Sequence, residues 1–347
     1  MLQTTSFARA RAQGAALLAA TFTLGAMLGG PAVAASRYDP STQELEAVLD
    51  DLKAWLPGGW DSFPQVWHER TVRAPLEGEH EHWYRTFALI DAPQVGKVVF
   101  YGQINMGGRD GPMMPRTQIL YTAEIDEKRG VVNVNGQTMV DPEKYEDLHR
   151  HPELWKEVRQ RDPAAIKCDF VWRRSGPQIV GVLDGKTEER RKYGPGTCNY
   201  QNAGNQEFLA DAEWVLSPDE LWLYDINKLN GMQFIGRHDQ THIRLYRARS
   251  YRCSVADRDG TRTLDAYDRG YTAPVTGRSG RKASAMLLRA PYPHADGRGL
   301  EDRLRLMLLE PDSTHVLASA DAAPVAPRVE LQHDGVTVKC ELAPAGH

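Results

Sequence analysis

Apolar residues recur at helical spacing near the start of the region that follows residue 40. Positions 45, 48, 49, 52, 55 and 56 are leucine, valine or tryptophan, so they fall on one face of a helix. Ser41 and Glu44 have the spacing of a capping box, in which the two residues satisfy each other's backbone N–H groups. We therefore predict an amphipathic helix at 42–56, ended by Pro57-Gly58-Gly59, that plugs or flanks a larger body.

Segments rich in β-branched and aromatic residues follow, each bounded by Gly, Pro, Asp or Glu. This pattern is typical of strands, and the predicted strands cover 66–73, 82–90, 97–106, 117–125, 130–140, 168–174, 178–183, 207–216, 221–225 and 242–253. A short helical insert is predicted at 141–159, and Asn230-Gly231 is the strongest hairpin signal. About ten strands in simple succession favour an up-and-down antiparallel β-barrel. A barrel of about eight strands can hold one small ligand.

The tail of the chain has a different composition. Residues 254–282 are rich in Asp, Arg, Gly and Ser, which predicts a long connection. Strands are predicted again at 283–290, 302–309 and 328–342, with an Ala- and Pro-rich loop at 318–327. We therefore divide the chain into a barrel domain at 36–253 and a small β-rich C-terminal extension at 254–347.

The N-terminus carries the pattern of an export signal. Arg9 and Arg11 precede an uncharged apolar stretch at 15–28, and small residues at Ala32 and Ala34 fit the site that signal peptidase reads. The apolar stretch is shorter than the roughly 20 residues that span a bilayer. We expect residues 1–35 to be a cleaved signal peptide, no transmembrane anchor after its removal, and a periplasmic or secreted protein.

Charge and cysteine content narrow the expectations further. The chain has 46 acidic and 42 basic side chains, and this near balance argues against a nucleic-acid partner. In an oxidising compartment the four cysteines are most simply two disulfides. Cys168–Cys198 lies within one strand-rich region, and Cys253–Cys340 would tie the chain end back to its last segment. Four unpaired buried thiols are the alternative.

Several motifs that would indicate enzymatic chemistry are incomplete or missing. His80-Glu81-His82 and His149-Arg150-His151 are potential metal ligands, but neither forms the H-E-x-x-H pattern of a helix-borne zinc site, so we predict no metal. The sequence contains no G-x-S-x-G nucleophile elbow and no phosphate-binding loop. Hydrolase and nucleotide-dependent activities are therefore disfavoured, and no catalytic residue is predicted.

The order of several short motifs resembles the CpcT/CpeT chromophore (phycobilin) lyase family. These motifs are LPGGWDSFPQ at 56–65, GKVVFYGQ at 96–103, PRTQILY at 115–121, CDFVW at 168–172, then Gly181, Cys198, Gly204 and Asp225, and GMQFIG at 231–236. Together they cover about residues 42–250. The leading Tyr and the second Arg of the family's Tyr-Arg-Gln-Arg strand are absent from 115–121.

The resemblance implies a lipocalin-like (calycin) β-barrel, often a homodimer, that attaches a linear tetrapyrrole (bilin) to a cysteine of an acceptor protein without metal or nucleotide. A tetrapyrrole needs aromatic walls and cations for its propionates. Arg116 is the first candidate for a propionate partner, and Asp225 would accept hydrogen bonds from pyrrole N–H groups. The other predicted ligand-binding residues are Tyr101, Gln103, Tyr121, Trp60 and Trp172. For both tryptophans the alternative is a place in the barrel core.

Three functions remain open at this stage. The first is a chromophore lyase that acts on an exported acceptor, as the resemblance implies. The second is a non-catalytic carrier of a tetrapyrrole or another apolar small molecule in the cell envelope. The third is a structural protein whose barrel is filled by its own side chains.

Overall fold

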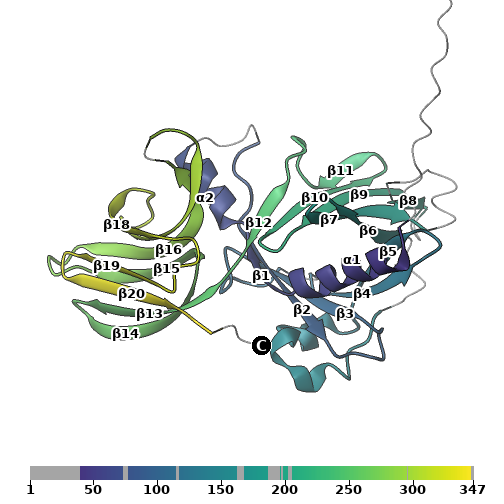
Figure 1. Cartoon of the computed structure of the whole chain (residues 1–347), viewed down its shortest axis with the longest axis horizontal. Helices are drawn as coiled ribbons and strands as arrows, with labels where there is room; N and C mark the ends of the chain where they lie inside the picture. Colours follow the sequence, from purple (N-terminus) through teal and green to yellow (C-terminus); the bar gives the residue numbers. More distant parts are fainter. Residues whose placement is uncertain are drawn as a thin grey trace, which may run out of the picture. The chain divides into compact units, whose positions relative to one another are not determined.

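The computed structural model describes residues 40–72, 77–114, 117–161, 168–186, 196, 198–201, 205–294 and 296–344 (Figure 1). The predicted signal peptide at 1–35 lies outside the described residues. Within the described residues, no helix is long and apolar enough to cross a membrane.

The first described element is the predicted amphipathic helix. Helix α1 spans Thr42–Trp55, and the capping box is complete because Ser41 Oγ accepts from Glu44 N (3.3 Å) while Glu44 Oε2 accepts from Ser41 N (2.8 Å). Its buried face carries Leu45, Val48 and Leu52. The capping box therefore stabilises the start of the helix, and the burial of its apolar face stabilises the rest.

Ten antiparallel strands form a closed barrel, which confirms the predicted fold class. The strands are β1 (Gly58–Asp61), β2 (Trp83–Ile90), β3 (Val99–Met106), β4 (Ile119–Asp126), β5 (Val131–Thr138), β6 (Cys168–Ser175), β7 (Gln178–Gly185), β9 (Glu207–Leu216), β10 (Glu220–Leu229) and β12 (Ile243–Arg247). Each pairs with the next in this order, and β12 pairs with β1 to close the ring. Two short strands extend the sheet, β8 (Cys198–Gln201) beside β9 and β11 (Met232–Ile235) beside β10.

The barrel core and helix α1 form one apolar cluster. Val48, Leu52 and Leu56 pack among inward-facing side chains of the strands, including the fully buried Trp60 and Phe100. Helix α1 lies against β4, β5, β6 and β7, and Figure 1 shows it crossing the barrel strands. The helix thus plugs part of the barrel.

Two local predictions within the barrel region were wrong or incomplete. The predicted strand at 66–73 is instead helix α2, Phe63–Thr71. Pro64 stands in its first turn, and Phe63 and Trp67 pack against β16 and β17 of the C-terminal region. The predicted helical insert consists of three 3₁₀ turns, η1 (Pro142–Tyr145), η2 (Leu148–Arg150) and η3 (Pro152–Leu154).

The tail forms two four-stranded antiparallel sheets, which we call the C-terminal sandwich. One sheet has the order β14 (Gly260–Tyr267), β13 (Ser250–Asp257), β20 (Val336–Leu342) and β19 (Arg328–His333); the other has the order β15 (Arg269–Thr276), β16 (Lys282–Pro293), β17 (Leu300–Leu309) and β18 (Val316–Ala322). Apolar side chains from both sheets form a single core. The long connection predicted at 254–282 is therefore wrong, because β13, β14 and β15 occupy it, and β18 takes part of the predicted loop at 318–327.

Both predicted disulfides are confirmed. Cys168 at the start of β6 is bonded to Cys198 at the start of β8, and Cys253 of β13 is bonded to Cys340, its cross-strand neighbour on β20. The chain has four cysteines in all. No thiol of this protein is left free to carry a covalent ligand.

Candidate functional site

Arg85 of β2 faces the part of the barrel interior that lies away from α1, whereas the inner-face arginines Arg174 and Arg247 contact α1. Side chains alternate between the two faces of a strand, and Arg85 of β2 shares the inner face with Phe87, a member of the barrel core. The strand in which it lies pairs with β1 and β3. An arginine inside a barrel wall must find partners there or remain costly, because burying a charge without them is unfavourable.

Aromatic rings surround this arginine. The Arg85 guanidinium lies 5.4 Å from the ring centroid of Trp214 and 5.5 Å from that of Trp83, distances at which cation–π attraction operates. Trp214 in turn contacts Phe170 (5.1 Å between centroids) and Tyr121 (5.9 Å). We call Arg85, Tyr121, Trp214 and Asp225 the Arg85 cluster.

Two glycines make room for the phenol ring of this cluster. Tyr121 on β4 lies between Gly102 on β3 and Gly136 on β5. A Cβ atom at either glycine would stand 3.0 Å from the Tyr121 ring. The absence of side chains at these two positions therefore lets the ring lie against the wall instead of filling the lumen.

The charges of the cluster are only partly compensated. Arg85 Nε is buried and has no hydrogen-bond partner within the described structure. Asp225 Oδ1 accepts a hydrogen bond from Asn227 Nδ2 (2.8 Å). Burial raises the pKa of Asp225 and the Arg85 charge opposes that rise, while burial lowers the pKa of Arg85. Burial also raises the pKa of Tyr121.

Solvent reaches the inner wall beside the cluster. Asp225 shares the inner face of β10 with Leu221 and Leu223, both members of the barrel core. Asp225 is enclosed by protein atoms, which raises its pKa, yet it is open to solvent, as is Gly136 on the inner face of β5. Arg174 and Arg247 contact α1 and its end. In the strand register these two arginines lie near Leu216 and Leu221, several residues away from Asp225 along the wall. The accessible part of the interior is therefore the part that α1 does not fill.

Of the predicted ligand-binding residues, the structure brings together Tyr121 and Asp225. Trp60 and Trp172 lie inside the barrel but are almost fully buried in its core. Trp60 Nε1 donates to Leu56 O (2.9 Å), so it fastens the end of α1. The core interpretation therefore describes both tryptophans best.

Tyr101 and Gln103 lie on the outer face of the barrel. Tyr101 Oη donates to Gln103 Oε1 (2.6 Å), and Gln103 Nε2 donates to Asp147 Oδ1 (2.6 Å). Tyr101 packs in a second apolar cluster with Tyr145 and Leu148 of the 3₁₀ segment. These two side chains thus hold that segment to the wall and do not face the lumen. Arg116 lies outside the described residues.

Arg85 and Trp214 were not among the residues predicted from the sequence. A signal for Arg85 was present, because Trp83, Arg85, Phe87 and Leu89 alternate with residues of the other face along one predicted strand. A charged residue in phase with aromatic ones is unusual for an inward face, and it marks a candidate binding position. Trp214 had no comparable mark, since a tryptophan in a strand is more often core.

A second buried polar network joins helix α2 to two loops. Glu69 Oε1 lies 2.7 Å from His80 Nδ1, and His80 Nε2 lies 3.0 Å from Thr241 Oγ1. This order of groups resembles a nucleophile, base and acid. However, the Thr241 hydroxyl donates to Asp239 Oδ1 (2.6 Å), so its proton is directed away from His80. The network is a fastening of α2 and not an activated hydroxyl.

Comparison with known proteins assigns no family to this chain. A scan against protein-family models finds no family model that matches it, and a search of the curated proteins finds no significant match.

Proposed function

We propose that this protein binds a linear tetrapyrrole in the barrel, at the Arg85 cluster. The observation that carries the proposal is Arg85 itself, an inward-facing guanidinium with an unpaired Nε. Arginine is the preferred partner of carboxylates because its N–H groups match them in geometry. A bilin propionate is a suitable anion for this position, and the rings of Trp214 and Tyr121 suit the apolar body of the pigment.

Asp225 has a matching role in the proposal. Its carboxylate lies near Arg85 and is accessible from the interior, so it would accept hydrogen bonds from pyrrole N–H groups. Such charge-assisted bonds are stronger than neutral ones. A ligand that offers both a carboxylate and N–H donors would satisfy the cluster better than a simple fatty acid would.

As a chromophore lyase, the protein would hold the bilin while an acceptor thiol adds to its vinyl-type double bond. The sulfur–carbon bond forms at one carbon and the thiol proton passes to the other, so no oxidant is needed. The gain would come from positioning and from protecting a reactive pigment. The thiol must belong to another protein, because both disulfides occupy all four cysteines of this chain.

The alternative is a non-catalytic carrier in the cell envelope. It is supported by the kind of groups described in the lumen, a cation, a carboxylate and aromatic rings, which would hold a pigment without any step of bond formation. Transfer of the pigment to a cysteine of an added acceptor protein separates the lyase from the carrier. The two disulfides fit the oxidising, exported location that both functions require.

An absorbance titration with biliverdin, a phycobilin and haem tests the binding proposal. We expect a saturable spectral shift with a bilin, weakened at least tenfold in Arg85→Gln. Arg244→Gln is the matched control, since Arg244 lies on the outer face of β12 over Trp222 (4.3 Å). Arg116→Ala, tested in parallel, examines the position that the sequence predicted.

Equal bilin affinity in the wild type and Arg85→Gln would remove the Arg85 cluster from the site. No saturable shift with any of the three pigments would favour the structural-barrel interpretation instead.

A further inference from the structure

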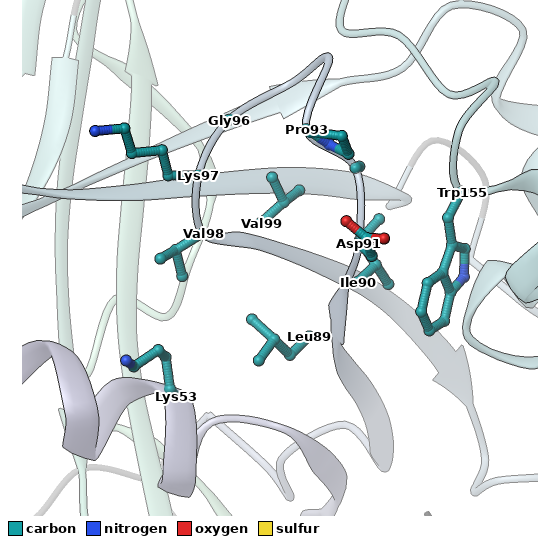
Figure 2. Close-up of a pocket in the computed structure, with 11 residues that line it drawn as sticks. Lys53, Leu89, Ile90, Asp91, Pro93, Gly96, Lys97, Val98, Val99 and Trp155 are labelled. Atoms are coloured by element: carbon teal, nitrogen blue, oxygen red, sulfur yellow. The ribbon is translucent and has the colours of Figure 1, made fainter.

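A groove lies at the edge of the barrel, away from the Arg85 cluster. It encloses about 500 Å³ between the C-terminal half of α1, the hairpin that joins β2 to β3, and Trp155. Cavities of this size hold small molecules. Figure 2 shows Lys53, Val98 and Lys97 on one side of it, Trp155 on the other, and Leu89 between them.

The floor of the groove is apolar and uncovered. Leu89 continues the inward face of β2 beyond Phe87, yet 44% of it is exposed. Helix α1 packs mainly against β4 to β7, and Lys53 is its residue that lines the groove. Trp155 Nε1 donates to Leu148 O (2.9 Å), so the polar atom of the indole is already satisfied and the ring presents apolar surface.

Positive charge is only partly compensated around the groove. The carboxylate on the rim, Asp91, is paired with Lys156. Lys97 forms no ion pair within the described structure, and Lys53 has only its helix neighbour Asp50 (2.6 Å), which is itself mostly exposed. The Asp91–Lys156 pair is just as exposed, so the two pairs count alike and cancel, and Lys97 is the unpaired charge of the groove among the described residues. One side of the groove is therefore cationic, beside an apolar floor.

We propose that this groove binds a single-chain anionic amphiphile, with a free fatty acid as its ligand. The carboxylate would lie between Lys53 and Lys97, and the alkyl chain would extend over Leu89 towards Trp155. The site is separate from the Arg85 cluster, and the proposal does not depend on bilin binding. It assigns the outer edge of the barrel a ligand of different shape from the one proposed for the interior.

Isothermal titration with dodecanoate below its micelle-forming concentration tests the site. We expect saturable binding, weakened about tenfold in the Lys53→Gln/Lys97→Gln double variant, because two exposed ion pairs are removed. Leu89→Asp should abolish binding by placing a carboxylate on the apolar floor. Lys282→Gln is the matched control, since this exposed lysine lies on β16 of the C-terminal sandwich.

Three results would overturn the proposal. Binding of dodecyltrimethylammonium as tight as that of dodecanoate would remove the role of the lysines. Loss of dodecanoate binding in Arg85→Gln, with the double lysine variant unaffected, would move the amphiphile into the barrel. No saturable binding to the wild-type protein would leave the groove without this ligand. Near-ultraviolet circular dichroism of each variant, matched to the wild type, excludes misfolding as the cause.

Discussion

The barrel and the C-terminal sandwich are built from the same kind of antiparallel strand, but they fill their interiors differently. Apolar side chains from both sheets close the sandwich core around the Cys253–Cys340 disulfide, and a gap there holds only about 10 Å³, roughly the space of one water. The barrel core is equally apolar beside α1. Farther along its wall, however, solvent reaches Asp225, and Arg85 Nε has no partner among the described groups.

This difference separates stabilising groups from candidate functional ones. Unpaired buried donors cost free energy, so folds retain them mostly where a ligand or a reaction uses them. The sandwich also has buried charges with an unpartnered atom, Arg289 Nη1 and Asp268 Oδ2. Each of these two side chains is nevertheless bonded through another atom, because Arg289 Nε donates to Asp302 Oδ2 (2.9 Å) and Asp268 Oδ1 accepts from Arg249 N (2.8 Å). Arg269 donates to Arg247 O (3.0 Å) and Arg289 O (2.6 Å), beside Asp268. The same residue type is thus structural in one region and a candidate ligand partner in the other.

The largest expected effect comes from Arg269→Met. The substitution removes the bonds to Arg247 at the end of the barrel and leaves Asp268 buried without its neighbouring charge. Breaking one side of a buried pair typically costs about 3–5 kcal/mol, and we expect a loss of this size in the free energy of unfolding, measured by urea denaturation. Arg252→Met is the control, because its pair with Asp265 is exposed. If both variants lost the same small amount of unfolding free energy, Arg269 would not be a structural link between the sandwich and the barrel.

The next effect distinguishes the two disulfides. Removing Cys253–Cys340 by alanine substitution should lower the free energy of unfolding by about 2–4 kcal/mol and leave bilin affinity unchanged. Removing Cys168–Cys198 should cost about 1 kcal/mol less, because the sequence separation is 30 residues instead of 87. Denaturant melts and bilin titrations on both variants measure this. If removal of the Cys253–Cys340 disulfide also lowered bilin affinity, the sandwich and the barrel would be energetically coupled and not separate.

Much of the barrel was predictable because its signals are local. Alternating strands, short turns and the Ser41–Glu44 capping box each act within a few residues. Helix α2 was not predictable in this way, because its apolar residues Phe63 and Trp67 suit either a strand or a helix. The surface that these two residues cover belongs to strands more than 200 residues later in the chain. Strands β14 and β15 and the second half of β13 were missed because polar residues on their exposed faces, such as Asp265 of β14 and Thr272 of β15, resemble a polar loop.

The candidate site was only partly predictable for a similar reason. Strand β3 is buried on both faces, one by the barrel core through Phe100 and the other by the 3₁₀ segment through Tyr101. Alternation alone therefore cannot tell which face is the lumen, and in the structure Tyr101 and Gln103 lie on the outer face. Phe87 marks the inner face of β2. Because side chains alternate along a strand, Arg85, two residues earlier, could have been placed on that face from the sequence.

A smaller effect is expected from Asp225→Asn on bilin binding. Burial raises the pKa of Asp225 above its ordinary 3.8. The carboxylate is therefore negatively charged above that raised pKa, and it loses this charge as the pH falls through it. Bilin affinity should therefore decline on acidification, and the asparagine variant should bind several-fold more weakly near pH 7 with a flatter pH profile. Absorbance titrations from pH 8 to pH 4 measure both. An unchanged profile in the variant would assign the pH dependence to the pigment's own carboxyls.

The smallest effect concerns the fastening of α2 between the two regions. Burial lowers the pKa of His80 below its ordinary 6.5, so between these two values the unfolded chain binds a proton that the folded protein does not. The free energy of unfolding should then fall as the pH drops below about 6.5, by at most about 1.4 kcal/mol per pH unit for one group. His80→Gln should flatten this slope, whereas His294→Gln, at an exposed position of the sandwich, should preserve it. Urea melts at pH 7.5 and pH 5.5 measure the difference, and identical slopes in the wild type and His80→Gln would show that the proton is taken up elsewhere.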